Sequence, residues 1–185
     1  MTRLILASRS PQRRAILAQL GIEFSVQVPD VEELESGPPH DVALENAYRK
    51  ASAVAEVASD GLVIGVDTVV SLGARLYGKP AGADEAKATL NALAGRRHAV
   101  ISGVCLIENG NVRSAAAQTL VEFRALSDGL IDWYLATEEW RGRAGGHAIQ
   151  GAGAALVAAI EGDYSNVVGL PVATLLELAP ELLPA

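Results

Sequence analysis

The segment from Leu4 to Gly21 reads LILASRSPQRRAILAQLG and places a short apolar run directly before a helical pattern. The run Leu4–Ala7 predicts a buried strand. Pro11–Leu20 predicts a helix, with Ser10 as its N-cap and Gly21 as its stop. A strand that leads through a short turn into a helix is typical of α/β proteins, in which such units build a sheet covered by helices.

The turn between this strand and this helix carries groups that bind anions. A helix N-terminus offers free backbone N–H groups and a partial positive charge, and Ser8 and Ser10 add hydroxyl donors. Arg13 follows in the first helical turn, and a guanidinium matches the geometry of a phosphate group. The turn therefore predicts a phosphate site. The alternative is a well-capped helix whose arginines face water, which is what we expect of Arg14.

Outward from this segment, strand and helix patterns continue to alternate. Strands are predicted at Phe24–Val28, Leu62–Val70, Ala99–Ile107, Val112–Phe123 and Ala154–Ile160. Helices are predicted from near Asp41 to before Gly61, at Asp84–Leu93, from Ser127 to about Ala136, and at Pro171–Leu178. An Asn-Gly pair at 109–110 predicts a hairpin. Because strand-to-helix and hairpin connections both occur, the expected fold class is α/β, with a mixed central sheet and flanking helices.

Composition and charge narrow the classes of function. The chain has 185 residues, 50% of them hydrophobic, and a formal net charge of −7. This length suits a single domain, 1–185, and the negative charge argues against binding to a nucleic acid polymer. Cys105 is the only cysteine, which favours a reducing compartment. The longest apolar stretch, Gly151–Ile160, is about half of the ~20 residues that a membrane span needs. We therefore expect a cytoplasmic protein with no membrane partner.

Asp67 is the polar residue that most strongly suggests a functional site. It interrupts the apolar stretch VIGVDTVV, which reads as a strand buried on both faces. An acid in such a strand is costly unless it is paired or bound to a metal, and active sites use buried acids with cationic partners. The alternative is a structural aspartate that hydrogen-bonds to Thr68.

Four further polar residues are candidates for the same site. Glu33 belongs to an acid pair in a loop, and its alternative is a solvated loop side chain. Lys50 lies on a predicted helix, where lysines are usually on the surface. Lys79 stands between a glycine and a proline, which favours a fixed direction for its side chain. Gln150 lies among glycines that allow a ligand to approach the backbone closely.

Three other kinds of chemistry are poorly supported by the sequence. The stretch GARLYGKP, from Gly73 to Pro80, resembles a P-loop, but the proline replaces the hydroxyl residue that would bind Mg²⁺. His40, His98 and His147 are scattered and match no spacing of metal ligands, so we expect them to be structural or exposed. Cys105 lies in a predicted strand and is expected in the core rather than as a nucleophile.

Nine segments, taken in order, resemble those of the Maf family of nucleotide pyrophosphatases, and the resemblance covers nearly the whole chain. They are LASRSPQRRAIL, PDVEE, ENAYRKA, VIGVDTVV, GKP, HAVISGV, VEFRALS, AGGHAIQG and GDYSNVVGLP. The resemblance implies an elongated fold like that of inosine-triphosphatase-type enzymes, with two lobes around a cleft. It also implies hydrolysis of a nucleoside triphosphate to monophosphate and pyrophosphate, a divalent metal cofactor (Mg²⁺ or Mn²⁺), and a homodimer.

The resemblance also implies roles for individual residues. Asp67 matches the proton acceptor, and Glu33 and Asp67 match the acidic site residues of the family, which we expect to hold the metal ion directly or through water. The implied catalytic residues are Asp67, Glu33, Lys79 and Arg13, and the implied substrate-binding residues are Ser8, Ser10, Gln12, Lys50 and Gln150. The chain departs from the family at three positions: Gln12 where many members have arginine, Arg143 where many have lysine, and His147 where many have tyrosine.

The segment AGGHAIQG indicates which substrates to expect. Its Ile-Gln-Gly ending resembles the branch that acts on dTTP and UTP. The branch that acts on 7-methyl-GTP usually has a Ser-Glu-Gly-type sequence there, and a tryptophan where this chain has Gln12. The resemblance therefore implies a dTTP/UTP pyrophosphatase, with modified pyrimidine nucleotides as further candidate substrates. The alternatives are a 7-methyl-GTP pyrophosphatase and a nucleotide-binding regulator of cell division with little turnover.

Overall fold

A mixed, seven-stranded sheet runs through the molecule in the computed structural model, which describes residues 3–58 and 60–183. The strand order is β2-β1-β3-β5-β6-β7, and β4 pairs with β3. β1 is parallel to β2 and β3, and the other pairs are antiparallel. The strands are β1 Leu4–Ala7, β2 Phe24–Val26, β3 Leu62–Leu72, β4 Arg75–Tyr77, β5 Arg97–Glu108, β6 Asn111–Phe123 and β7 Val157–Glu161.

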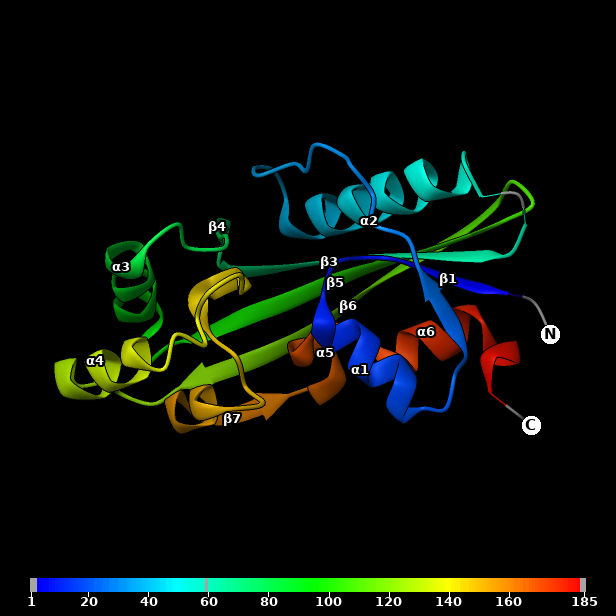
Figure 1. Ribbon diagram of the computed structural model, residues 1–185. Coiled ribbons are helices and arrows are strands. Elements are labelled where there is room, and N and C mark those ends of the chain that lie inside the picture. The colour runs from blue at the N-terminus through cyan, green and yellow to red at the C-terminus, as the bar shows by residue number, and fades with distance from the viewer. Residues whose placement is uncertain (1–2, 59, 184–185) are drawn as a thin grey trace.

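Helices cover both faces of the sheet, as the sequence predicts for an α/β fold (Figure 1). The α-helices are α1 Pro11–Gln19, α2 Pro39–Ala55, α3 Ala83–Leu93, α4 Asp128–Ala136, α5 Tyr164–Val168 and α6 Val172–Leu178. Short 3-10 helices are η1 Ala144–Gly146, η2 Ala152–Leu156 and η3 Pro180–Leu182. Among the residues described, no helix is both long and apolar enough to cross a membrane.

Helix α2 lies unusually close to the sheet, because glycines lie beneath it. A Cβ atom on Gly65 of β3 would collide with the backbone carbonyl of Ala47, and one on Gly103 of β5 would collide with that of Ala43. Together with Ala51, these alanines form a smooth stripe along the buried side of the helix. The close packing fixes the position of every polar side chain that α2 directs toward β3.

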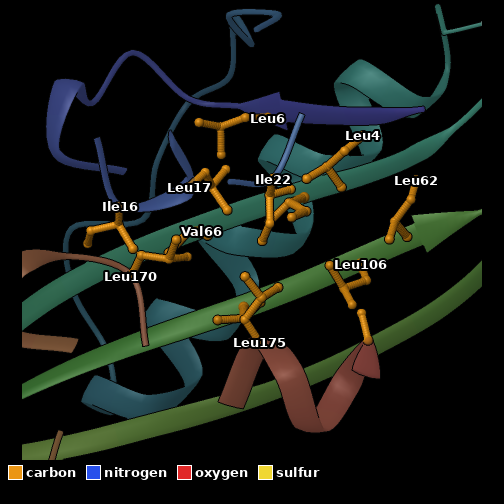
Figure 2. Packing of buried hydrophobic residues seen from close by; sticks show 13 residues of the cluster. Leu4, Leu6, Ile16, Leu17, Ile22, Leu62, Val66, Leu106, Leu170 and Leu175 are labelled. Carbon is orange, nitrogen blue, oxygen red and sulfur yellow. The ribbon is translucent and has the colours of Figure 1, made fainter. Parts of the chain in front are cut away.

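The opposite face of the sheet carries a leucine-rich core. Side chains alternate along a strand, so Leu4 and Leu6 of β1, Leu62 of β3 and Leu106 of β5 share one face. Figure 2 shows this group packed together with Leu17 and with Leu175 of α6. This core holds α1 and α6 against one face of the sheet. Helix α2 packs on the other face (Figure 1).

A second hydrophobic cluster lies toward the other end of the long strands. Helices α3 and α4 occupy this end, away from the two termini (Figure 1). The largest fully buried side chains there are Trp140, Tyr134 and Phe123. The mixed α/β class with helices around a central sheet is confirmed.

The structure corrects several predicted element boundaries. The strand predicted at Phe24–Val28 ends at Val26, and the strand predicted at Ala154–Ile160 begins only at Val157. Residues before Val157 form η2, because alanines and glycines lack the branched side chains that favour strands. Helix α5 and strand β4 are not predicted by the sequence patterns. The Asn-Gly hairpin is confirmed: Asn109 and Gly110 have φ values of 50° and 78° and connect β5 to β6.

Candidate active site

The candidate site lies where β1 ends beside β3. Strand β1 pairs with Leu62–Gly65, and β4 pairs with Val70–Leu72, so no described strand pairs with 66–69 along that edge. The chain leaves β1 at Ala7 and turns into α1. Ligands of open α/β sheets bind outside the carboxyl ends of strands at such interruptions. The topology therefore leaves room for a ligand directly beside Asp67 and Thr68.

Side chains alternate along β3, so Asp67 and Thr68 place functional groups on opposite faces of the sheet. Asp67 lies on the same face as Gly65 and Gly103, beneath α2. Thr68 lies on the other face, where its hydroxyl is 2.8 Å from the Ser102 hydroxyl and accepts a 3.1 Å hydrogen bond from Arg13. The alternative in which Thr68 satisfies Asp67 is therefore wrong.

Lys50 and Asn46 of α2 contact the Asp67 carboxylate, and Glu33 from a loop contacts Lys50. Lys50 Nζ lies 2.5 Å from Asp67 Oδ1 and 3.0 Å from Glu33 Oε1. Both Asp67 and Lys50 are buried, with 5% and 7% of their surface exposed, so the Lys50 charge compensates a carboxylate that water reaches poorly. Lys50 is thus not the surface lysine that its place on a helix suggested.

Asn46 is a site residue that the sequence analysis missed. It lies one turn before Lys50 on α2, and its Nδ2 donates to Asp67 Oδ2 at 3.2 Å. The same side chain accepts from Leu34 N at 2.7 Å and donates to Leu34 O at 3.0 Å. Asn46 therefore ties the loop that carries Glu33 to the acid on β3. The i, i+4 spacing of Asn46 and Lys50 was the available signal, because such residues share one helix face.

Arg13 is held mainly by protein groups. Its Nε donates to Gly169 O at 2.8 Å, its Nη1 to Ser8 Oγ at 3.0 Å, and its Nη2 to Thr68 Oγ1. Burial lowers the pKa of Arg13, and the charges of Asp67 and Glu33 oppose this shift. Three of the five N–H groups of a guanidinium are then occupied, which leaves about two for a ligand.

The turn before α1 has the geometry that its sequence predicts. Ser10 caps the helix by accepting from Arg13 N at 3.4 Å, and Ser8 Oγ accepts from Ser10 N at 3.2 Å. Gln12 Oε1 accepts from Ser10 Oγ at 3.3 Å. Arg14 is exposed and donates to the carbonyl of Arg9, as expected for the arginine that faces water.

A cavity of about 530 Å³ lies between the two ends of the molecule and collects most of the predicted site residues. It is lined by Ser8, Ser10, Gln12, Arg13, Glu33, Lys50, Lys79 and Gln150, and also by Arg9, Arg143 and His147. Asp67 does not belong to the lining; it lies next to it, in contact with Lys50. The structure thus brings the predicted residues together from six separate segments of the sequence.

Two of the three histidines, although distant in sequence, form one buried cluster. The His98 and His147 rings lie 5.3 Å apart, and both pack edge-on against Phe123. Burial lowers the pKa of His98 to about 3 and that of His147 to about 4, so both are neutral at physiological pH. No ring nitrogen of His98 has a partner with hydrogen-bond geometry, although the Arg96 backbone lies close enough to oppose its pKa shift slightly.

Metal ligands and nucleophiles are scarce in the described part of the chain. No group of three or more His, Cys, Asp or Glu side chains there is arranged to hold a metal ion. Cys105 is buried, and burial raises the pKa of its thiol to about 11. Its predicted place in the core is confirmed, and the acids at the cavity are Asp30, Glu33 and, behind Lys50, Asp67.

The comparison with known protein families decides the assignment. Residues 3–182 match the family described as Maf-like protein. The chain belongs to the Maf family. The resemblance on nine segments is thereby confirmed over nearly the whole length of this Maf protein.

Relatives of this Maf protein share its length as well as its sequence. It is 42% identical over 180 residues to a protein of Pyrococcus furiosus, covering 96% of this chain and 94% of that one. It is 45% identical to one of Anaeromyxobacter dehalogenans (92% and 89% covered) and 44% identical to one of Deinococcus radiodurans (95% and 91% covered). All three are named dTTP/UTP pyrophosphatase. A crystal structure of protein VC0702 from Vibrio cholerae matches with a TM-score of 0.40 and 9% identity, covering 74% and 68% of the two chains, too weakly to support any conclusion.

Proposed function

We propose that this protein hydrolyses dTTP and UTP to the nucleoside monophosphate and pyrophosphate. The observation that carries this proposal is the buried Asp67–Lys50 ion pair, which the exposed Glu33 joins through Lys50, beside a cavity of about 530 Å³. Buried acids with cationic partners next to a large cavity that carries a few converging polar groups are typical of active sites. The names of relatives with 42% to 45% identity supply the substrate class.

Asp67 is the proposed proton acceptor for the attacking water. A general base must lie beside the reacting atoms and keep an accepting lone pair free. Oδ1 faces Lys50, whereas Oδ2 accepts only the weaker amide donor of Asn46, which leaves Oδ2 as the oxygen better placed to take the proton. Lys50 compensates the charge of the two acids before substrate arrives.

Glu33 and Asp67 would hold the divalent metal. Two carboxylates suit Mg²⁺, which is usually bound by one or two carboxylates together with substrate phosphates and water. The absence of a cluster of three or more ligands within the described residues agrees with such a site, which is completed by the nucleotide. When bound, a divalent cation polarises the phosphate and offsets its charge.

The turn before α1 and the far wall of the cavity are proposed to bind the nucleotide. Ser8, Ser10 and Gln12 offer hydroxyl and amide groups at the helix N-terminus, and Arg13 and Lys79 offer positive charge. Gln150 also lines the cavity, in the segment proposed to contact the nucleoside. We further propose that residues 1–185 act as one domain, and as a homodimer.

The test is hydrolysis of a nucleotide panel by the purified protein with Mg²⁺. We expect monophosphate and pyrophosphate from dTTP and UTP, no turnover of 7-methyl-GTP, and loss of activity when EDTA removes the metal. Turnover of 7-methyl-GTP instead would replace the proposed substrates. Nucleotide binding without any turnover would contradict an enzymatic role and favour a regulator.

A further inference from the structure

Two cations that line the cavity come from segments that are distant in the sequence but adjacent in the fold. Lys79 follows Gly78, whose carbonyl accepts a 3.0 Å hydrogen bond from Gly145 N. Arg143 lies two residues before Gly145, and Gly146 packs against Pro80. The two segments are therefore adjacent, and both Lys79 and Arg143 line the cavity.

In the part of the chain that the structure describes, Lys79 and Arg143 have no counterion, whereas three other cations of the cavity have partners; the side chain of Arg9, which also lines the cavity, is exposed to solvent. Lys50 is shared by two acids, Arg13 donates to three acceptors, and Arg141 pairs with Glu138 at 2.7 Å. Within the described residues, the side chains of Lys79 and Arg143 make no hydrogen bond and no ion pair. The Nε of Arg143 is moreover buried without any partner.

Lys79 and Arg143 have no negatively charged partner among the described residues. A buried donor without a partner is destabilising, more so when it belongs to a charged group. Two like charges on adjacent segments also repel each other. Proteins retain such arrangements at sites where a ligand supplies the missing charge. A base or a sugar carries no charge, whereas the β- and γ-phosphates of a nucleoside triphosphate do.

We propose that Arg143, together with Lys79, binds the β- and γ-phosphates and so receives the pyrophosphate leaving group. This inference rests on the proposed function and adds Arg143 to its catalytic residues. An arginine fork binds phosphate oxygens in pairs, with Nε and one Nη as the natural donors. The unpartnered Nε is one half of such a fork.

The chemistry of the step explains why a cation is needed at this place. The water oxygen forms a bond to the α-phosphorus, and a proton of that water passes to Asp67. The bond between the α-phosphorus and the bridging oxygen breaks, and its electron pair stays on that oxygen. The new negative charge thus appears on pyrophosphate, where Arg143 stabilises it in the transition state.

Calorimetric titration with inorganic pyrophosphate and, separately, with dTMP tests this inference, in one magnesium buffer. The variants are Arg143→Met and Arg143→Lys, and the matched control is Arg96→Met, which removes one exposed positive charge outside the cavity. We expect Arg143→Met to weaken pyrophosphate binding about 10- to 100-fold, the range for a charged hydrogen bond. Binding of dTMP should change less than about twofold. Arg143→Lys should fall between wild type and Arg143→Met, and Arg96→Met should match wild type.

The outcomes separate this inference from the proposed function. Pyrophosphate binding that depends on Arg143 in a protein that hydrolyses no nucleotide would support the anion site and contradict the enzyme. Unchanged pyrophosphate binding in both Arg143 variants would overturn the inference, as would an equal loss of dTMP binding. Thermal melting of each variant shows whether it is folded, and Arg143→Lys provides the result if Arg143→Met does not fold.

Discussion

The proposed reaction depends more on Asp67 than on any other side chain. Its two oxygens have different partners, Lys50 on one and Asn46 on the other, and all three residues are buried. This arrangement fixes the direction of the carboxylate before substrate binds. Preorganised groups of this kind contribute to catalysis because they need no rearrangement during the reaction.

Replacing Asp67 with asparagine keeps the shape and removes the accepting charge. We expect Asp67→Asn to lower kcat for dTTP about 100-fold or more, the usual scale for loss of a general base. Pyrophosphate release measures the effect. The control is Asp84→Asn, on the exposed start of α3, which should retain wild-type turnover. Wild-type kcat in Asp67→Asn would rule out a role for Asp67 as proton acceptor.

Asn46 helps to fix the position of Glu33, because it hydrogen-bonds to the backbone of the neighbouring residue Leu34. Asn46→Leu keeps the size of the side chain but removes all three hydrogen bonds to Leu34 and Asp67. We expect faster amide hydrogen exchange in residues 30–38 and a kcat about tenfold lower, as expected for the loss of a hydrogen bond of about 1.4 kcal/mol. Tyr48→Leu, at an exposed position of the same helix, is the control. Unchanged exchange in the loop would show that Asn46 does not hold it.

At this scale the sequence predicted the acids better than their partners. Asp67 was recognisable because an acid interrupts a strand that is otherwise apolar. Lys50 was a candidate but its burial was not predictable, and Asn46 was missed, because polar residues on a helix usually face water. Their burial follows from how closely α2 approaches the sheet, and that distance depends on glycines in two other strands.

Among the elements, α2 is the one that assembles the site. It rests on Gly65 and Gly103, and Asn46 and Lys50 come from the same turns of the helix that contact these glycines. A side chain on either glycine must push the helix away from β3. The position of the catalytic acid therefore depends on residues that themselves have no functional group.

Adding one methyl group beneath α2 tests this dependence. We expect Gly65→Ala to lower the free energy of unfolding by about 1–3 kcal/mol, as overpacking does, and to lower kcat as well. Gly129→Ala on α4 is the matched control, because a Cβ there meets nothing within 4 Å. This control should raise stability by up to about 1 kcal/mol, since alanine favours a helix. Denaturant titration and pyrophosphate release measure both; a Gly65→Ala protein as stable and active as wild type would contradict the account.

Most elements were predictable because their signals are local. Ser10 and Pro11 start α1, and the pair Asn109–Gly110 forms the hairpin between β5 and β6. Helix α5 has five residues and begins after a turn, too short to produce a periodic pattern. Strand β4 has three residues and is defined by its pairing with β3, which no local pattern shows.

Across the whole molecule, the long strands connect two hydrophobic clusters, and the cavity lies between them. Ser8 and Arg13 come from the end with the termini, whereas Lys79 and Arg143 come from the end with α3 and α4. The paired histidines lie in this second part. The contact between His98 and His147 could not be predicted, because the two residues are far apart in the sequence. The fold brings His98 of β5 next to His147, which follows η1.

The buried histidines make global stability depend on pH. Burial lowers the pKa of His98 to about 3 and that of His147 to about 4, below the value of about 6.5 in an unfolded chain. Between these values the unfolded chain binds protons that the folded chain does not, so stability falls as pH falls from about 6.5 toward 4. At pH 5 the expected loss is about 2 kcal/mol for each histidine.

Unfolding titrations at pH 7 and pH 5 measure this effect. His98→Phe keeps a flat aromatic ring against Phe123 and should reduce the difference between the two pH values by about 2 kcal/mol. His40→Gln, at an exposed position, should leave the difference unchanged. An equal pH dependence in wild type and His98→Phe would show that His98 is not the group responsible.

Hydrolysis of dTTP in heavy-oxygen water tests the central claim most directly. Attack at the α-phosphorus must place the oxygen of water on the nucleotide, because the bond that breaks leaves the bridging oxygen on pyrophosphate. With Mg²⁺ and wild-type protein, mass spectrometry should find one heavy oxygen in dTMP and none in pyrophosphate. Label in pyrophosphate, or dTDP and labelled phosphate as products, would place the attack on another phosphorus and contradict the proposed reaction.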